Sequence, residues 1–163
     1  MRKKQDKRQK IINTAVKLFV KDGIHQTSIQ MLAKKAGVST GSVYTYFDSK
    51  ETLVVEAFYN VLHESIEAVT TDYDASKSVK ERFYHLLEQR IRYNIKYPTK
   101  FQFLNLCSAE PTVMKDVLDN DCETSALATV IIDGKKQGII RDLPPQDVLY
   151  QIIGGISFSL EWR

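Results

Sequence analysis

The chain has 163 residues, of which 43% are hydrophobic and 26% charged. This globular composition excludes wholesale disorder and a collagen-like repeat, and the length allows one domain or a small head on a larger body. Gly154 and Gly155 interrupt the apolar run at 152–160, so no stretch reaches the roughly 20 residues of a membrane span. No signal-peptide stretch follows the basic start, so we expect a soluble cytoplasmic protein with no membrane partner.

The two parts of the sequence differ in charge. Residues 1–50 hold 11 Lys or Arg against three Asp, a net charge of +8, whereas the remaining 12 basic and 17 acidic residues give −5. A basic head on an acidic body indicates a polyanionic partner for the head alone. A solvated lysine-rich tail explains the charge equally well. Charge alone therefore does not distinguish a polyanion-binding head from such a tail, and sequence motifs are needed.

Two helices are predicted at the start of the chain. Apolar residues recur at helical spacing over 7–21, with lysines on the other face, and Asp22-Gly23 ends this helix. Thr27 or Ser28 caps the second helix, and Gln30 lies three residues beyond Thr27, as a capping-box partner does.

A helix-turn-helix is the pattern that follows. Gly37 ends the second helix, because glycine adopts a left-handed conformation without steric cost, and Ser39 caps a third short helix. A three-residue turn containing glycine joins helices in this way, and the second of the pair is short enough for the DNA major groove. Val43 and Phe47 are expected to point inward and hold the helices together.

The third helix has the chemistry of a DNA-contacting surface. Its small polar residues let the backbone approach DNA closely, while its hydroxyls donate to phosphates or bases. Tyr44 and Tyr46 add phenolic donors, and Lys50 adds a cation after the turn. Any small helical hairpin remains an alternative, but the charge asymmetry favours the DNA interpretation.

The rest of the chain predicts further helices. Apolar stripes and proline positions place them at 50–69, at 79 to about 95 before Pro98, from Pro111 onward, and at 146 to about 160. A polar stretch covers 70–78, and 101–107 is a short apolar segment. Residues 128–142 fit a β-hairpin or a helix ending at Gly138, and the long Gly-Lys-Lys-Gln connection favours the helix.

Residues 27–53, TSIQMLAKKAGVSTGSVYTYFDSKETL, strongly resemble the DNA-binding segment of the TetR family of bacterial transcriptional regulators. The shared features are the Ala-Gly-Val-Ser turn, the Tyr-x-Tyr-Phe recognition helix and the Lys-x-x-Leu opening of the next helix. The resemblance is firm over residues 7–55 and topological beyond. It implies an all-α homodimer that represses a promoter at palindromic operator half-sites until a small molecule binds the body. By position, the DNA-facing roles fall to Thr27, Ser39, Thr40, Gly41, Ser42, Tyr44, Thr45, Tyr46 and Lys50.

Two departures from the family pattern affect the domain prediction. Met31 occupies a position that is usually acidic, which weakens one possible helix cap. The chain ends at Trp162-Arg163, within or just after the first of the two usual dimerisation helices, so it is either truncated or has an abbreviated interface. We expect a DNA-binding domain at 1–50, with its motif at about 28–47 and the family-type domain reaching about 65, and a regulatory and dimerisation domain at 51–163.

Other chemistries fit less well. Gly37 to Gly41 matches the Gly-x-Ser-x-Gly pattern of a hydrolase, but that motif needs a preceding strand, and the residues before Gly37 have a helical pattern. The three histidines and two cysteines, His25, His63, His85, Cys107 and Cys122, lack metal-ligand spacing, so we predict no cofactor, no metal site and reduced thiols. An enzyme is therefore not expected.

The body is expected to bind an apolar or aromatic effector and a second copy of the chain. The candidate effector residues, each equally at home in a core, are Phe58, Leu62, Phe83, Leu87, Phe103 and Met114. The candidate dimer stripe is Leu149, Ile152, Ile153 and Ile156. The alternative to a ligand-gated repressor is an architectural or division-linked DNA-binding protein of the same fold without an effector.

Overall fold

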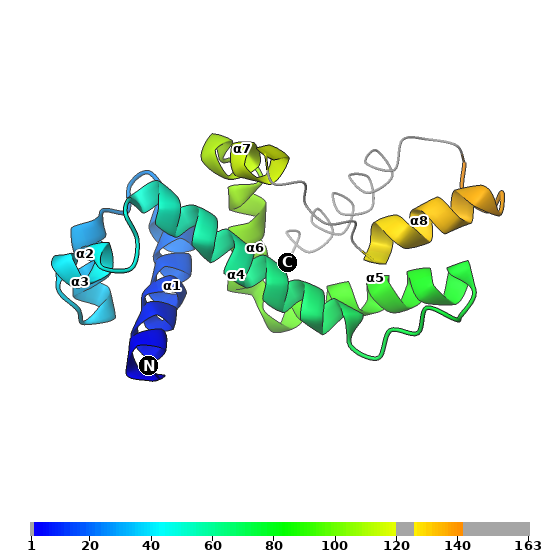
Figure 1. Ribbon diagram of the computed structural model, residues 1–163, viewed down its shortest axis with the longest axis horizontal. Helices are drawn as coiled ribbons and strands as arrows, with labels where there is room; N and C mark the ends of the chain where they lie inside the picture. Colours follow the sequence, from blue (N-terminus) through cyan, green and yellow to red (C-terminus); the bar gives the residue numbers. More distant parts are fainter. Residues whose placement is uncertain (1, 120–125, 142–163) are drawn as a thin grey trace. The chain divides into compact units, whose positions relative to one another are not determined.

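The computed structural model describes residues 2–119 and 126–141, and all regular secondary structure in this part of the chain is helical (Figure 1). This confirms the all-α fold class. The helices are α1 (Arg2–Asp22), α2 (Ile29–Ala36), α3 (Thr40–Tyr44), α4 (Lys50–Thr70), α5 (Val79–Lys96), α6 (Pro98–Cys107), α7 (Pro111–Asp119) and α8 (Ala126–Lys136). Across these ranges no helix is both long and apolar enough to cross a membrane.

The helices divide into two compact units. The first unit combines residues up to His63 with the segment that begins at Pro98, and so contains α1, α2, α3, the start of α4, α6 and α7. The second unit contains the end of α4, then α5 and α8. The domain boundary predicted at residue 50 lies just after the helix-turn-helix. In the structure, the helix-turn-helix belongs to the same compact unit as α6 and α7.

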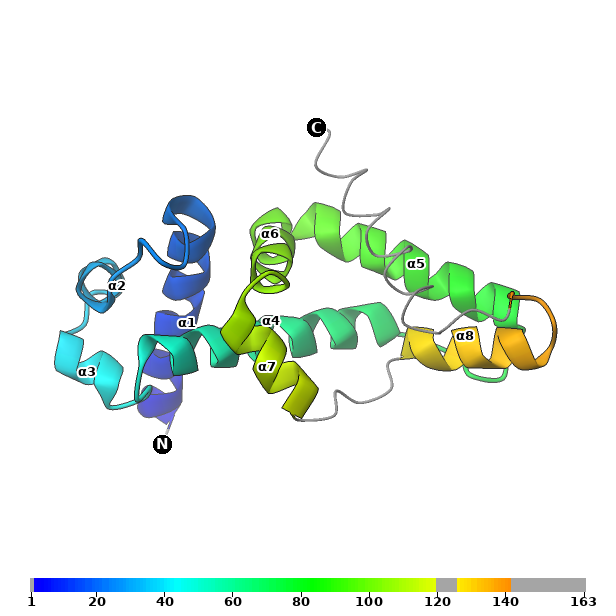
Figure 2. The ribbon, with the colours of Figure 1, turned by 90° about the horizontal axis from the view of Figure 1, so that it is seen from above.

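The core of the first unit forms around α1. Ile11, Ile12 and Phe19 are fully buried on one face of this helix, as their helical spacing predicted. The ring of Phe19 stacks on that of Phe103 from α6, with centroids 6.1 Å apart. Helix α1 also contacts α2, so it carries the helix-turn-helix on one side and α6 on the other (Figure 2).

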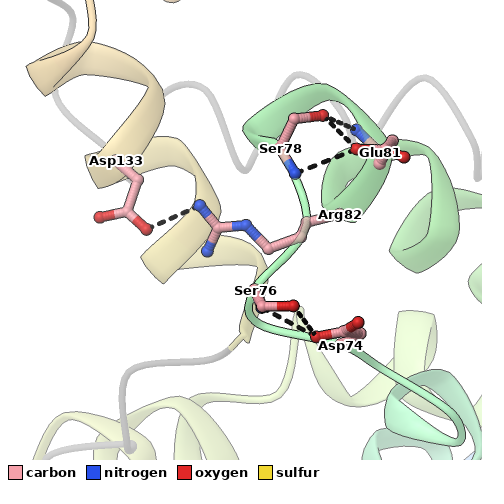
Figure 3. Close-up of polar contacts among 6 residues, drawn as sticks. All are labelled: Asp74, Ser76, Ser78, Glu81, Arg82 and Asp133. Atoms are coloured by element: carbon pink, nitrogen blue, oxygen red, sulfur yellow. Dashed lines mark hydrogen bonds and ion pairs between the residues drawn. The ribbon is translucent and has the colours of Figure 1, made fainter.

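The second unit is held by α5 against α8, which lie side by side in both views (Figures 1 and 2). Figure 3 shows Arg82 of α5 reaching Asp133 of α8, with Nη2 and Oδ2 2.9 Å apart. Helix α5 starts with a capping box, in which the Ser78 hydroxyl accepts from the Glu81 N–H and the Glu81 carboxylate accepts from the Ser78 N–H. The Ser78 hydroxyl also donates to the Glu81 carboxylate at 2.6 Å, and this hydrogen bond, followed by the one from the Ser78 N–H, lowers the pKa of Glu81.

The ambiguous segment is a helix. Residues 126–136 form α8, and Gly138 then adopts a left-handed φ of +70°, so the predicted helical alternative is confirmed and its end lies near the predicted glycine. The predicted last helix at 146–160 lies outside the described residues.

Candidate nucleic-acid interface

The turn between α2 and α3 has the predicted geometry. Gly37 has φ 66° and ψ 39°, and its N–H and that of Val38 bond to carbonyls of the last turn of α2. The Ser39 hydroxyl then accepts from the Ser42 N–H at 3.1 Å and caps α3. The chain therefore reverses within three residues and presents α3 as a separate short helix.

Helix α3 has a buried and an exposed side. Val43 is fully buried and Phe47, just after the helix, is 1% exposed, which confirms that both side chains point inward. Tyr44, on the opposite side, is 52% exposed. The remaining predicted DNA-facing residues of this region are exposed or half-buried, namely Ser39, Thr40, Gly41, Ser42, Thr45 and Tyr46.

Gly41 leaves the backbone of α3 open to an approaching molecule. A Cβ atom built at this position would meet no atom within 4 Å, so the fold itself does not require glycine there. The Thr45 hydroxyl donates to the Gly41 carbonyl at 2.9 Å, so its proton is used within the helix and its oxygen remains available as an acceptor. Close backbone approach to DNA is a physical reason for glycine inside this helix.

Thr27 is buried, unlike the other residues that the family resemblance predicts to contact DNA. Its side chain is 1% exposed, and its hydroxyl donates to the Gly23 carbonyl at 2.8 Å. Ser28, not Thr27, caps α2 by accepting from the Met31 N–H. In this structure Thr27 therefore fastens the α1–α2 connection.

Lys50 is the first residue of α4 and lies beside the α1–α2 connection. Its Nζ donates to the His25 carbonyl at 3.2 Å. The His25 ring in turn lies 3.0 Å from the carboxylate of Glu110, a buried residue at the start of α7. The contact between His25 and Glu110 was not predicted, because residues 85 positions apart give no signal in sequence spacing.

Arg8 is a second residue that the sequence did not single out. Its guanidinium pairs with Glu56 of α4 and lies over the Phe47 ring, 5.3 Å from the centroid. Arg8 was counted in the charge of the basic head, but this contact neutralises it and fastens α1 to α4. Lys10, by contrast, is exposed and extends its Nζ toward Gly37.

Helix α2 occupies the residues just before Gly37, where a hydrolase nucleophile elbow requires a strand. The Gly-x-Ser-x-Gly pattern is therefore the turn of a helix-turn-helix at this place.

The six candidate effector residues do not all belong to one unit. Phe103 is fully buried in the core of the first unit, and Phe58 packs against the same core. Phe83 packs on the smaller apolar cluster of the second unit. Leu62, Leu87 and Met114 are half-buried. The dimer stripe, Leu149, Ile152, Ile153 and Ile156, lies outside the described residues.

Residues 11–57 match a family described as bacterial regulatory proteins, tetR family. The chain is 33% identical over 82 residues to the fatty acid metabolism regulator protein of Bacillus subtilis, a match that covers 50% of this chain and 42% of that protein. The aligned segment thus spans less than half of that relative.

Solved structures extend the similarity to more than nine-tenths of the chain. A tetR family transcription regulator from Shewanella sp. PV-4 has a TM-score of 0.83 and 28% identity, covering 95% of this chain and 86% of the other. The regulator FadR from Bacillus subtilis, in complex with stearoyl-CoA, has a TM-score of 0.69 and 23% identity, covering 91% and 82%. This second likeness is one of fold.

Proposed function

The chain belongs to the TetR family of bacterial regulatory proteins, and we propose that it is a DNA-binding transcriptional repressor that a small-molecule effector releases from its operator. The observation that carries the proposal is the exposed polar face of α3, presented by the Gly37 turn and backed by the buried side chains of Val43 and Phe47. The positive charge of residues 1–50 supports binding to the phosphate backbone.

Selection from a random double-stranded DNA library with the full chain tests DNA binding. We expect enrichment of a motif made of two inverted half-sites, because one recognition helix covers only a few base pairs. Tyr44→Ala is the matched control, since it shortens an exposed side chain of α3. Equal enrichment of unrelated sequences by the chain and this variant would contradict a sequence-specific function.

A homodimer is the second part of the proposal. Two half-sites require two heads related by a twofold axis, and relatives of this fold are transcription regulators. Sedimentation of the full chain at tens of micromolar should give the mass of a dimer. A monomer would remove the dimer from the proposal and leave the DNA-binding head unaffected.

An effector with an apolar body is the third part. The fatty acid metabolism regulator and the stearoyl-CoA complex among the similar proteins favour an acyl-type ligand. A thermal-shift screen followed by operator titration tests this. Coupling is reciprocal, so a compound that weakens operator binding must itself bind more weakly when operator is present, by the same factor. If no compound that binds the chain alters operator affinity, the proposed effector control fails.

A further inference from the structure

Arg90 is a half-buried cation of α5 in the second unit. Its Nη1 donates at 3.0 Å to the hydroxyl of Ser65, which is itself fully buried near the end of α4. Burial lowers the pKa of the Arg90 guanidinium, although it stays protonated at neutral pH. Within residues 2–119 and 126–141, Arg90 forms no ion pair with a carboxylate.

Two neighbours of Arg90 also bury polar atoms. Tyr93 and Asn94 are each 4% exposed, and within the described ranges the Tyr93 hydroxyl and the Asn94 Oδ1 have no hydrogen-bond partner. Burial, reinforced by the negative charge of Glu64, raises the pKa of Tyr93 to about 12, so its hydroxyl remains a donor at neutral pH. Positions 90, 93 and 94 lie on one side of α5, because residues three and four apart are neighbours on a helix.

Burying polar groups without hydrogen-bond partners lowers the stability of the folded state. A buried cation normally pairs with a carboxylate, and a buried hydroxyl or amide oxygen normally has a partner. Arg90 meets a neutral hydroxyl instead, and two further polar atoms beside it are unpartnered. A negatively charged oxygen group would accept from the guanidinium and the Tyr93 hydroxyl together, whereas the Asn94 Oδ1, itself an acceptor, would still need a donor.

A cleft of the second unit meets this cluster at Tyr93. It has a volume of about 620 Å³ and is lined by residues of the end of α4 and the second half of α5, among them Ala68, Gln89 and Tyr93. Tyr93 therefore borders the cleft and also belongs to the buried cluster. Lys96 lines the same cleft and supplies a positive charge that attracts an anion, whereas Arg92, which also lines it, is paired with Glu88. The Tyr97 ring adds apolar surface.

We propose that Arg90 and Tyr93 bind the carboxylate or phosphate group of an amphiphilic organic anion, whose apolar body occupies the cleft between the end of α4 and α5. The inference rests on the proposed effector function and names the chemical class of the ligand. It places the head group of the effector at Arg90 and Tyr93 of α5, neither of which is among the six candidate effector residues.

Three probes with the same ten-carbon chain test the head group. Decanoate carries a carboxylate, decyl phosphate carries a phosphate, and 1-decanol carries neither, and each is titrated calorimetrically into the full chain below its aggregation concentration. We expect at least one anion to bind about tenfold or more tightly than 1-decanol, and the tighter anion identifies the head group. Equal binding of all three probes, or no binding of either anion, would overturn the proposal.

Arg90→Met and Tyr93→Phe test the two residues. Tyr93→Phe removes a hydroxyl that has no hydrogen-bond partner within the described ranges, so the melting temperature without ligand should stay the same or rise. Arg90→Met removes the donor to the buried Ser65 hydroxyl, so its melting temperature should fall. Anion affinity should fall about tenfold or more for Arg90→Met and measurably for Tyr93→Phe, whereas Lys80→Gln, an exposed cation elsewhere on α5, should change nothing. Unchanged anion affinity in Tyr93→Phe would overturn the assignment. If Arg90→Met does not fold, Tyr93→Phe alone tests the anion site.

The proposal and the proposed function fail in different ways. If another compound releases the operator while decanoate and decyl phosphate do not bind, effector control stands and the anion site is wrong. If the anions bind through Arg90 but never alter DNA binding, the site stands and the control of the operator is wrong.

Discussion

Lys50 donates a hydrogen bond from its Nζ to the backbone carbonyl of His25, 3.2 Å away. The contact joins the first residue of α4 to the α1–α2 connection, so the cation is held close to the recognition helix. It remains half-buried rather than enclosed. A carbonyl does not neutralise a cation, and the ammonium group keeps further donors for a phosphate.

We therefore expect Lys50→Ala to weaken DNA binding for all sequences alike. The loss of one phosphate contact should reduce the slope of log affinity against log salt by about 0.9. Fluorescence anisotropy across a salt series measures this slope, with Lys80→Ala on α5 as the control for a change of one net charge. Wild-type affinity and slope in Lys50→Ala would assign Lys50 to the fold alone.

Gly41→Leu should separate DNA binding from stability. A side chain at Gly41 enters open space, and leucine favours a helix over glycine by several tenths of a kcal/mol, so the melting temperature should be retained or rise. The same side chain covers the exposed backbone of α3, so operator binding should be lost. A variant that binds operator normally would show that close backbone approach is not the reason for this glycine.

Gly134→Leu is the matched substitution with the opposite outcome. A Cβ atom at Gly134 would lie 2.7 Å from the Ile140 Cδ1 and 3.2 Å from the Val79 Cγ1, so a larger side chain must displace both. Overpacking of this kind costs about 1–3 kcal/mol. We expect a lower melting temperature by calorimetry, with DNA affinity unchanged in the folded protein. An unchanged melting temperature would show that the α5–α8 contact adapts freely.

Local rules predicted most of the helices, because capping, periodicity and turn chemistry act over a few residues. Gly37 and Ser39 took the predicted roles at the turn, and Val43 and Phe47 are buried as expected. Contacts between distant residues were beyond the sequence. Nothing in the local pattern indicates that Arg8 meets Glu56, or that Arg90 shares a buried group with Ser65.

Burial also shows that two of the predicted site residues, Thr27 and Phe103, have internal contacts in the fold. Thr27 has the residue type of a DNA contact, but its hydroxyl is used internally, because the chain must turn at Gly23. The aromatic residues expected around an effector are equally suited to a core, and Phe103 serves as core in the first unit. Residue type alone does not separate these roles, since both require an apolar surface.

Arg82 and Arg92 provide a matched pair for testing what holds the second unit together. Arg82 is 8% exposed and pairs with Asp133 of α8, whereas Arg92 pairs with Glu88 one helical turn away in full contact with solvent. Arg82→Ala should lower the melting temperature clearly, because it removes a link between helices and leaves Asp133 unpaired. Arg92→Ala should change it little, because exposed pairs are screened. Equal effects would contradict the role of the Arg82–Asp133 contact.

Cys107 should make the protein less stable at alkaline pH. This thiol is fully buried in the core of the first unit, and burial, together with the negative charge of Glu110, raises its pKa from 9.0 to about 12. Above pH 9 the unfolded chain releases the thiol proton while the folded chain retains it. The unfolded state is then favoured, so the contribution of this group to stability falls as pH rises, by up to about 1.4 kcal/mol per pH unit until pH approaches 12.

Urea unfolding of the full chain between pH 8 and pH 10.5 measures this loss, with Cys107→Ala as the control. Tyrosine and lysine titrations affect both proteins equally, so the difference between the two stability curves isolates Cys107. We expect Cys107→Ala to be less stable than the wild type at pH 8 and to lose less stability as pH rises. Parallel curves for the two proteins would mean that the thiol titrates at its ordinary pKa, and hence that solvent reaches it in the folded state.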